Sequence, residues 1–235
     1  MQDVVVLGAT VSGLTAARRL ASDGFSVVVL DPNPEFVSAA IGHGLAACAH
    51  ASTCSNMAGA YSDSAVTEHV RRNLAGLEEI RKVLATGGLE ATQCELHDRS
   101  LGVALVREAE HVAHLMVAAG AEVEIAETPG GPVLQSPALL IDPHAYAEAL
   151  HAQASTAGAR ITHDVTVTHI RRLDGLTQVM LRRNLAWVRD VEMFSAHAVI
   201  DTLGISPWGT LAGVGTEQYV STLRVPGRSE GASLD

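Results

Sequence analysis

Two short apolar runs open the chain, and a segment with helical periodicity separates them. Residues 4–7 and 27–30 are continuously apolar, which is typical of strands buried on both faces of a parallel sheet. Between them, apolar residues recur at helical spacing over 11–23, and Gly24 follows as the expected C′ glycine. The pattern predicts a β–α–β unit with a right-handed crossover.

The middle of the chain changes from small residues to a long amphipathic pattern. Residues 35–60 are rich in Ala, Gly, Ser and His without a clear period, so we expect a long loop with room for one short helix. Apolar positions then line one face of a helix over 64–86. The pattern further predicts strands at 92–96 and 101–106, and a helix at 108–119.

The last third begins with a helix and continues with strands. Asp142 and Pro143 are suited to the N-cap and first position of a helix that runs to about residue 157. After this helix, short β-prone segments separated by turn residues predict an antiparallel meander. The expected strands are 160–170, 178–182, 186–191 and 197–201.

Composition narrows the classes of function. The formal net charge is −10, and no basic stripe offsets it, which argues against nucleic acid as a partner. Three cysteines make no disulfide framework and fit a reducing compartment. The first residues lack the features of a signal peptide. The apolar runs are shorter than the about 20 residues that cross a bilayer, so we expect a cytoplasmic protein without a membrane partner.

A glycine motif stands between the first strand and the first helix. The segment matches G-x-G-x-x-G except at the second glycine, where Thr10 stands. In this motif the first glycine makes a tight turn, the second admits the pyrophosphate, and the third lets helix and strand pack closely. Thr10 puts a β-branched side chain where the pyrophosphate would lie, while the helix N-terminus still attracts an anion. The expected phosphate-binding residues are Gly8, Ala9, Thr10, Val11, Ser12 and Gly13.

An acidic residue ends the second strand. Asp31 follows Gly13 by 18 residues, where a carboxylate accepts hydrogen bonds from a ribose hydroxyl and disfavours the 2′-phosphate of NADP. Strand, motif, helix and acid together favour a Rossmann-type dinucleotide-binding unit. The alternative is a Rossmann scaffold that kept its packing glycines and lost its ligand.

The stretch from Val5 to Ala17, continued to Asp31, resembles the FAD fingerprint of the D-amino-acid oxidase and glycine oxidase superfamily. Segments 140–161, 165–170 and 198–204 also resemble segments of that family, in the same order. The resemblance implies an α/β fold. This fold is a Rossmann-type FAD/NAD(P)-binding domain with a parallel sheet, an antiparallel β-meander and a partial, truncated substrate lobe.

The resemblance also implies domain boundaries, a cofactor and further site residues. We expect a single FAD-binding-type domain over 1–235, with a small inserted substrate-lobe segment at 88–140. FAD is the implied cofactor, and no residue stands out as a catalytic acid or base. Beyond the glycine turn and Asp31, the implied cofactor-binding residues are Pro32, Ser52, Thr53, Val165, Thr202 and Gly204.

A group of histidines and cysteines invites a metal interpretation. His43, Cys48, His50 and Cys54 lie close together in the chain, and neutral His and Cys thiolate are zinc ligands. Their spacing matches no common zinc pattern. We therefore expect no metal site in this segment.

Two hypotheses about function follow. The first is an FAD-dependent oxidoreductase that acts on an amine or amino acid by hydride transfer to flavin, either alone or as one subunit of a split enzyme. The second is a degenerate, non-redox member that reuses the scaffold for binding, assembly or another reaction. The expected partners are a small-molecule substrate and either a second copy of the chain or a complementary subunit.

Overall fold

The computed structural model describes residues 1–48, 50–100, 106–128, 131–183, 191–203, 220–223 and 231–234. The chain divides into two compact units. Unit 1 comprises Met1–Gly42 and Pro143–Val214, and unit 2 comprises His43–Asp142 and Gly215–Asp235. The segment expected to form an inserted lobe, 88–140, lies within unit 2. The expected domain boundaries, a single domain over 1–235 with an inserted segment at 88–140, stay a prediction.

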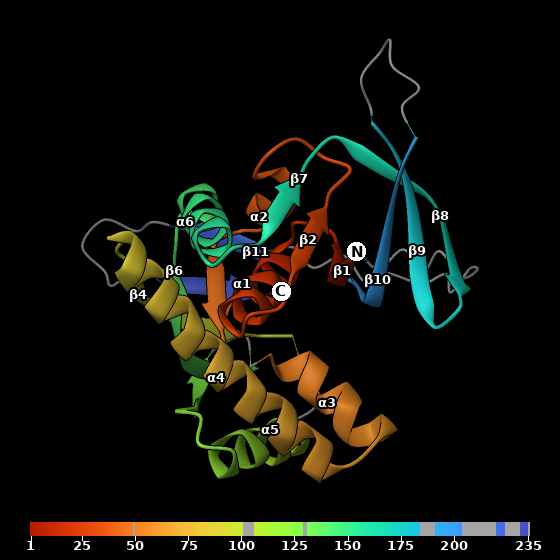
Figure 1. Ribbon diagram of the computed structural model, residues 1–235. Helices are drawn as coiled ribbons and strands as arrows, with labels where there is room; N and C mark the ends of the chain where they lie inside the picture. The colour runs from red at the N-terminus through yellow and green to blue at the C-terminus, as the bar shows by residue number, and fades with distance from the viewer. Residues whose placement is uncertain are drawn as a thin grey trace. The chain divides into compact units, whose positions relative to one another are not determined.

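Unit 1 is built on a six-stranded sheet in the order β7-β2-β1-β10-β9-β8. β1 pairs in parallel with β2 and β10, and β2 pairs in parallel with β7. β8, β9 and β10 form an antiparallel meander (Figure 1). These pairings confirm the α/β fold with its parallel sheet and meander. The strands are β1 (Gln2–Leu7), β2 (Val27–Leu30), β7 (Arg160–Thr162), β8 (Val165–Leu173), β9 (Leu176–Arg183) and β10 (Val191–Asp201).

Burial explains why the first β–α–β unit is visible in the sequence. All four residues of β2 are buried, and Val5 and Val6 of β1 are fully buried, as expected for central parallel strands. α1 buries Leu14 and Ala17, and it lies against α6. α6 begins at Pro143, as predicted. The helices of this unit are α1 (Val11–Ser22), α2 (Val37–Ala40) and α6 (Pro143–Thr156).

Unit 2 contains a second sheet and three helices. The sheet order is β11-β12-β4-β6-β3, with β5 also paired to β6. Its strands are β3 (Leu45–Ala47), β4 (Thr92–Asp98), β5 (Glu124–Thr128), β6 (Gly131–Leu140), β11 (Val220–Leu223) and β12 (Gly231–Leu234). Its helices are α3 (Ala51–Ala60), α4 (Asp63–Gly87) and α5 (Val106–Ala118). Among the residues that the structure describes, no helix is both long and apolar enough to cross a membrane.

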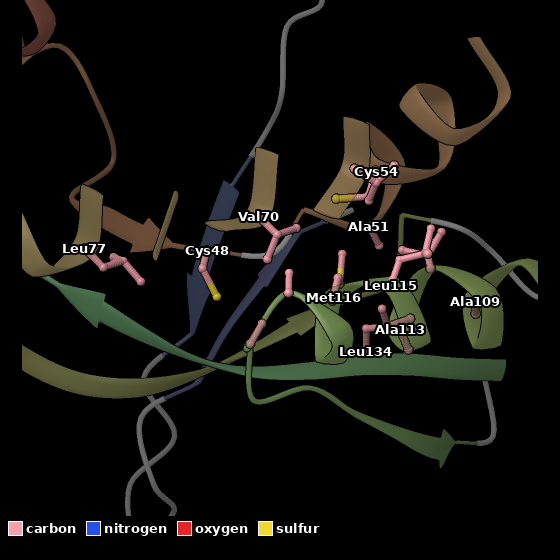
Figure 2. Packing of buried hydrophobic residues seen from close by; sticks show 14 of the residues in the cluster. Cys48, Ala51, Cys54, Val70, Leu77, Ala109, Ala113, Leu115, Met116 and Leu134 are labelled. Carbon is pink, nitrogen blue, oxygen red and sulfur yellow. The ribbon is translucent and has the colours of Figure 1, made fainter. Parts of the chain in front are cut away.

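The expectation of a long loop over 35–60 was wrong. The segment contains α2, β3 and the ten-residue helix α3. α3 buries Ala51 and Cys54, which contribute to the core of unit 2 (Figure 2). These side chains are small, so they pack tightly without the large apolar residues that make a helical period visible.

The strands around residue 130 were not predicted. β5 pairs with residues 131–135 of β6, and β3 pairs with 138–140. Proline is normally confined to strand edges because it lacks an N–H donor. Pro137 pairs with Glu95 of β4 on one side, and on the other side it lies between the stretches paired with β5 and β3, where a missing donor is tolerated.

One predicted strand is interrupted in the structure, and two others lie almost entirely outside the described residues. The expected strand 160–170 is interrupted, because Asp164 has a positive φ of 55° that turns the chain between β7 and β8. The expected strands 101–106 and 186–191 lie outside the described residues, apart from Val106, which begins α5, and Val191, which begins β10.

Candidate dinucleotide-binding site

Two glycines shape the turn that joins β1 to α1. Gly8 has a positive φ of 99°, and a Cβ there would lie 2.8 Å from Cδ2 of Leu203. A Cβ on Gly13 would lie only 2.0 Å from the carbonyl oxygen of Gly8. The helix therefore begins so close to the strand end that only glycine fits, as the first and third glycines of the motif require.

Thr10 is the N-cap of α1. Its Oγ1 accepts a hydrogen bond from the Gly13 N–H at 3.1 Å and donates one to Oγ1 of Thr202 at 2.9 Å. Thr202 Oγ1 in turn donates to the Leu7 carbonyl oxygen at 2.9 Å. Threonine is a favoured N-cap residue. Its hydroxyl is therefore held within the turn, and it satisfies one N–H group that a phosphate would otherwise bind.

Two N–H groups of the first helical turn remain available. The first intrahelical bond runs from Leu14 N–H to the Thr10 carbonyl oxygen. The Val11 and Ser12 N–H groups have no acceptor among the described residues, and both residues are exposed. Such groups, together with the helix dipole, attract anions. The turn thus keeps part of its expected capacity to bind phosphate.

Asp31 is fully buried at the end of β2. Its Oδ2 accepts a hydrogen bond from Ala9 N–H. Its Oδ1 accepts bonds from Asn33 N–H and Ser38 Oγ, both at 2.8 Å. A carboxylate offers about four acceptor positions, and the chain itself fills three of them. One position remains for the predicted bond to a ribose hydroxyl, but Asp31 is fully buried, so neighbouring side chains such as Ser38 must shift before the hydroxyl can reach it.

A cavity of about 130 Å³ lies at the carboxyl ends of β1 and β2. Cofactors of open α/β sheets bind at this edge, and the lining is mostly apolar, which suits a flat ring system. The cavity brings the predicted residues Pro32 and Val165 together. Its lining consists of Leu7, Leu30, Pro32, Val165, Thr166, Val167, Asp201 and Leu203.

Backbone hydrogen bonds hold the two sides of this cavity together. Asp31 N–H donates to the Thr162 carbonyl oxygen at 2.9 Å, and Val165 N–H donates to the Asp31 carbonyl oxygen at 3.0 Å. Sequence reasoning did not predict Leu7, Leu30, Asp201 and Leu203 as lining residues. Thr166 and Val167 lie in the segment 165–170, whose resemblance to the family implied contact with the adenine side of FAD.

Three further predicted site residues lie outside the described part of unit 1. Ser52 and Thr53 are in the first turn of α3, in unit 2, where Ser52 N–H donates to Oγ of Ser100 at 3.1 Å. Their contact with the cofactor stays a prediction. Gly204 lies outside the described residues.

The histidine and cysteine segment is part of the core of unit 2. Cys48 and Cys54 are buried among apolar side chains (Figure 2). Burial raises the pKa of both thiols. A zinc ligand must be a thiolate, so this environment opposes metal binding by these two residues.

Solved structures with the same fold come from amino-acid enzymes. L-proline dehydrogenase from P. horikoshii has a TM-score of 0.62 and 15% identity over 85% of this chain and 52% of its own. L-amino acid deaminase from Proteus vulgaris has a TM-score of 0.58 and 14% identity over 86% and 47%. Glycine oxidase from Geobacillus kaustophilus has a TM-score of 0.55 and 14% identity over 86% and 55%. The chain thus spans about half the length of these proteins.

A comparison with protein families matches nearly the whole chain. Residues 3–230 match the family described as FAD dependent oxidoreductase, DAO. A search of the curated proteins found no match. The family match confirms the resemblance that the N-terminal fingerprint indicated.

Proposed function

Because the chain belongs to the FAD dependent oxidoreductase family, DAO, we propose that it binds FAD on unit 1 and oxidises an amine or an amino acid. FAD is the cofactor of this family. The observation that carries the proposal is that a phosphate-attracting helix start and an apolar cavity lie at the same edge of the sheet. The helix start, with its available N–H groups at Val11 and Ser12, follows β1, and the cavity lies beside Pro32 and Val165.

The residues present fit FAD in three places. Gly8 and Gly13 keep side chains out of the turn, so the pyrophosphate has access to backbone. The Val11 and Ser12 N–H groups would bind its oxygens. The apolar cavity beside Val165 would take the adenine ring, and Asp31 would accept a ribose hydroxyl at its fourth acceptor position once neighbouring side chains give access to it.

When bound, FAD supplies the electron acceptor for oxidation of a carbon–nitrogen bond, and the protein binds and orients it. The solved structures with this fold are named for L-proline, L-amino acids and glycine. These names support an amine or amino acid as the substrate class. No acid–base residue is assigned to the reaction.

The direct test is the absorbance spectrum of the purified protein and of the supernatant after denaturation. We expect a flavin spectrum and released FAD. Added FAD should also raise the melting temperature, since a ligand at about 100 times its Kd stabilises by about 2.7 kcal/mol. A colourless protein whose melting temperature does not respond to FAD contradicts the proposal.

Val11→Pro tests the role of a single N–H group. Proline is favoured at the first helical position, and the extended conformation of Thr10 (φ −73°, ψ 170°) accepts a following proline. The variant should fold normally. It should bind FAD about tenfold or more weakly, because a hydrogen bond to a charged group contributes about 1.5–3 kcal/mol.

The matched control is Asp63→Pro at the start of α4. Asp63 also occupies the first helical position, after the extended N-cap Ser62. This variant should leave the FAD affinity unchanged. Equal loss in both variants would mean that proline acts through the fold and not through the missing N–H.

A degenerate, non-redox member is the second candidate. Two observations favour it: Thr10 Oγ1 already binds the Gly13 N–H, and Asp31 already accepts three hydrogen bonds. Thr10→Gly distinguishes the candidates, because glycine frees that N–H and costs the helix only a few tenths of a kcal/mol. If the wild-type chain does not bind FAD and the Thr10→Gly variant does, the result would favour the degenerate member.

We also propose that the protein acts in the cytoplasm, either as a homodimer or with a complementary subunit. The three cysteines of the sequence are too few and too odd in number for a disulfide framework, which supports a reducing compartment. A partner chain would supply the region that corresponds to the part of glycine oxidase outside the match, since this chain covers 55% of that protein. Light scattering during size-exclusion chromatography, with and without candidate partners co-expressed, tests both forms of assembly.

A further inference from the structure

Three potential metal ligands from separate segments of unit 1 meet at one point. Glu35 lies in the loop after β2, His151 in α6, and His163 between β7 and β8. Nε2 of His151 lies 3.3 Å from Nε2 of His163 and 3.6 Å from Oε1 of Glu35. All three ligand atoms lie within 4.8 Å of one another.

The separation of the two imidazole nitrogens matches a tetrahedral zinc ion. Zinc binds histidine nitrogen and carboxylate oxygen at about 2.0–2.2 Å, so two ligands of a tetrahedral site lie roughly 3.3 Å apart. The two imidazoles already have this spacing. The Glu35 carboxylate lies 3.6 Å from His151 and within 4.8 Å of His163, so it would need to move by up to about 1.5 Å to complete the site, and its side chain is 56% exposed and can adjust.

Packing holds the two imidazoles in position. Their rings are stacked with centroids 5.4 Å apart and an interplanar angle of 24°. Phe36 lies edge-on to His151, with centroids 5.3 Å apart. The His151 side chain is only 16% exposed. An ion would therefore meet two imidazoles held by packing, while the exposed Glu35 marks an approach from solvent.

The hydrogen-bonding state of the histidines also favours a metal. His163 Nδ1 is buried without a partner among the described residues, so Nε2 is the only polar atom through which the structure holds this ring.

We propose that Glu35, His151 and His163 form a zinc site with three protein ligands and a fourth position open to water. The proposal does not depend on FAD. The ion would tie the loop after β2 to α6 and to the turn before β8. In the same loop, Asn33 donates to Asp31 and accepts a bond from Asp164 N–H at 3.3 Å.

The test is a titration of the full chain, freed of metal and without added FAD, with Zn²⁺ in competition with a chromophoric chelator. We expect one equivalent of zinc to bind with a Kd in the micromolar range or below. His151→Gln and His163→Gln should each weaken binding by about tenfold or more, and Glu35→Gln should weaken it as well.

The matched control is His144→Gln. His144 lies on the same helix, 5.7 Å from Phe36 between ring centroids, and 3.4 Å from Glu148, but it is not part of the cluster. It should retain the wild-type affinity. Replacing zinc with Co²⁺ should produce the intense visible bands of a tetrahedral site.

Two results would overturn the proposal. One is the absence of a stoichiometric zinc ion. The other is equal affinity in the wild type and in Glu35→Gln, a variant whose exposed side chain can change without affecting the fold. Thermal melts of the metal-free histidine variants distinguish loss of a ligand from loss of structure.

Discussion

A missing Cβ at one residue decides how closely the first helix can approach the sheet. Gly13→Ala would place a methyl group 2.0 Å from the Gly8 carbonyl oxygen, and neither backbone segment can move without shifting a whole element. We expect a loss of about 3 kcal/mol or more in the free energy of unfolding, the upper end for overpacking. Urea denaturation monitored by circular dichroism measures it.

Gly76→Ala in α4 is the matched control. A Cβ at Gly76 meets nothing within 4 Å, so alanine should be neutral or should stabilise by about 0.5–1 kcal/mol through its helix propensity. Comparable destabilisation by both variants would contradict the packing role of Gly13.

A second residue-scale prediction concerns pH. Burial lowers the pKa of His50, although the Asp98 carboxylate acts in the opposite direction. The unfolded chain therefore takes up this proton at about pH 6.5, where the folded chain does not. Stability should be fully present above that pH and should fall as the pH drops toward the lowered pKa of the folded state.

His50→Gln removes this contribution and should flatten the decline in unfolding free energy between about pH 7.5 and 5.5. Urea titrations at several pH values measure the slope. His114→Gln, an exposed position on α5, serves as the control and should leave the slope as in the wild type. An unchanged slope in His50→Gln would refute the prediction.

At the scale of elements, the long helix α4 depends on its N-cap. Ser62 Oγ accepts a hydrogen bond from Ala65 N–H at 3.2 Å. Ser62→Ala should cost about 1 kcal/mol, whereas Ser62→Gly should cost only a few tenths, because glycine lets water reach the helix start. Thermal unfolding of the two variants compares them, and a larger loss for glycine would contradict a capping role.

Elements also differ in how visible they were in the sequence. α4 carries large apolar residues at helical spacing, and Val66, Val70 and Leu77 are buried as its period predicts. α3 uses Ala51 and Cys54 instead. Small residues contribute little to a hydrophobic pattern, although they allow helices to pack closely.

At the scale of the whole molecule, FAD should act unevenly on the two units. Hydrogen exchange with and without FAD should show slower exchange at the Val11 and Ser12 amides, and at the amides of 165–167 beside the cavity. The reason is that bound ligand satisfies the Val11 and Ser12 N–H groups, which are open to solvent in its absence, and makes local opening rarer at 165–167, where the N–H of Val165 is already bonded within the chain. Uniform protection across both units would argue against a site at this sheet edge.

The sequence by itself determined the elements whose side chains are large and regularly spaced, and it determined the glycine turn. Buried valine runs predicted the parallel strands, and Gly8 and Gly13 marked the turn, because these signals depend only on near neighbours in the chain. The family resemblance implied Val165 as a cofactor-binding residue, and Val165 lines the cavity at the carboxyl ends of β1 and β2.

Only the tertiary structure decided the state of the polar groups. The Thr10 hydroxyl accepts a hydrogen bond from the Gly13 N–H and donates one to Thr202. The Asp31 carboxylate accepts hydrogen bonds from the Ala9 N–H and the Ser38 hydroxyl. The cluster of Glu35, His151 and His163 likewise joins residues more than a hundred positions apart in the chain. Hydrogen bonds and metal geometry depend on ångström distances between such residues, and no local pattern encodes those distances.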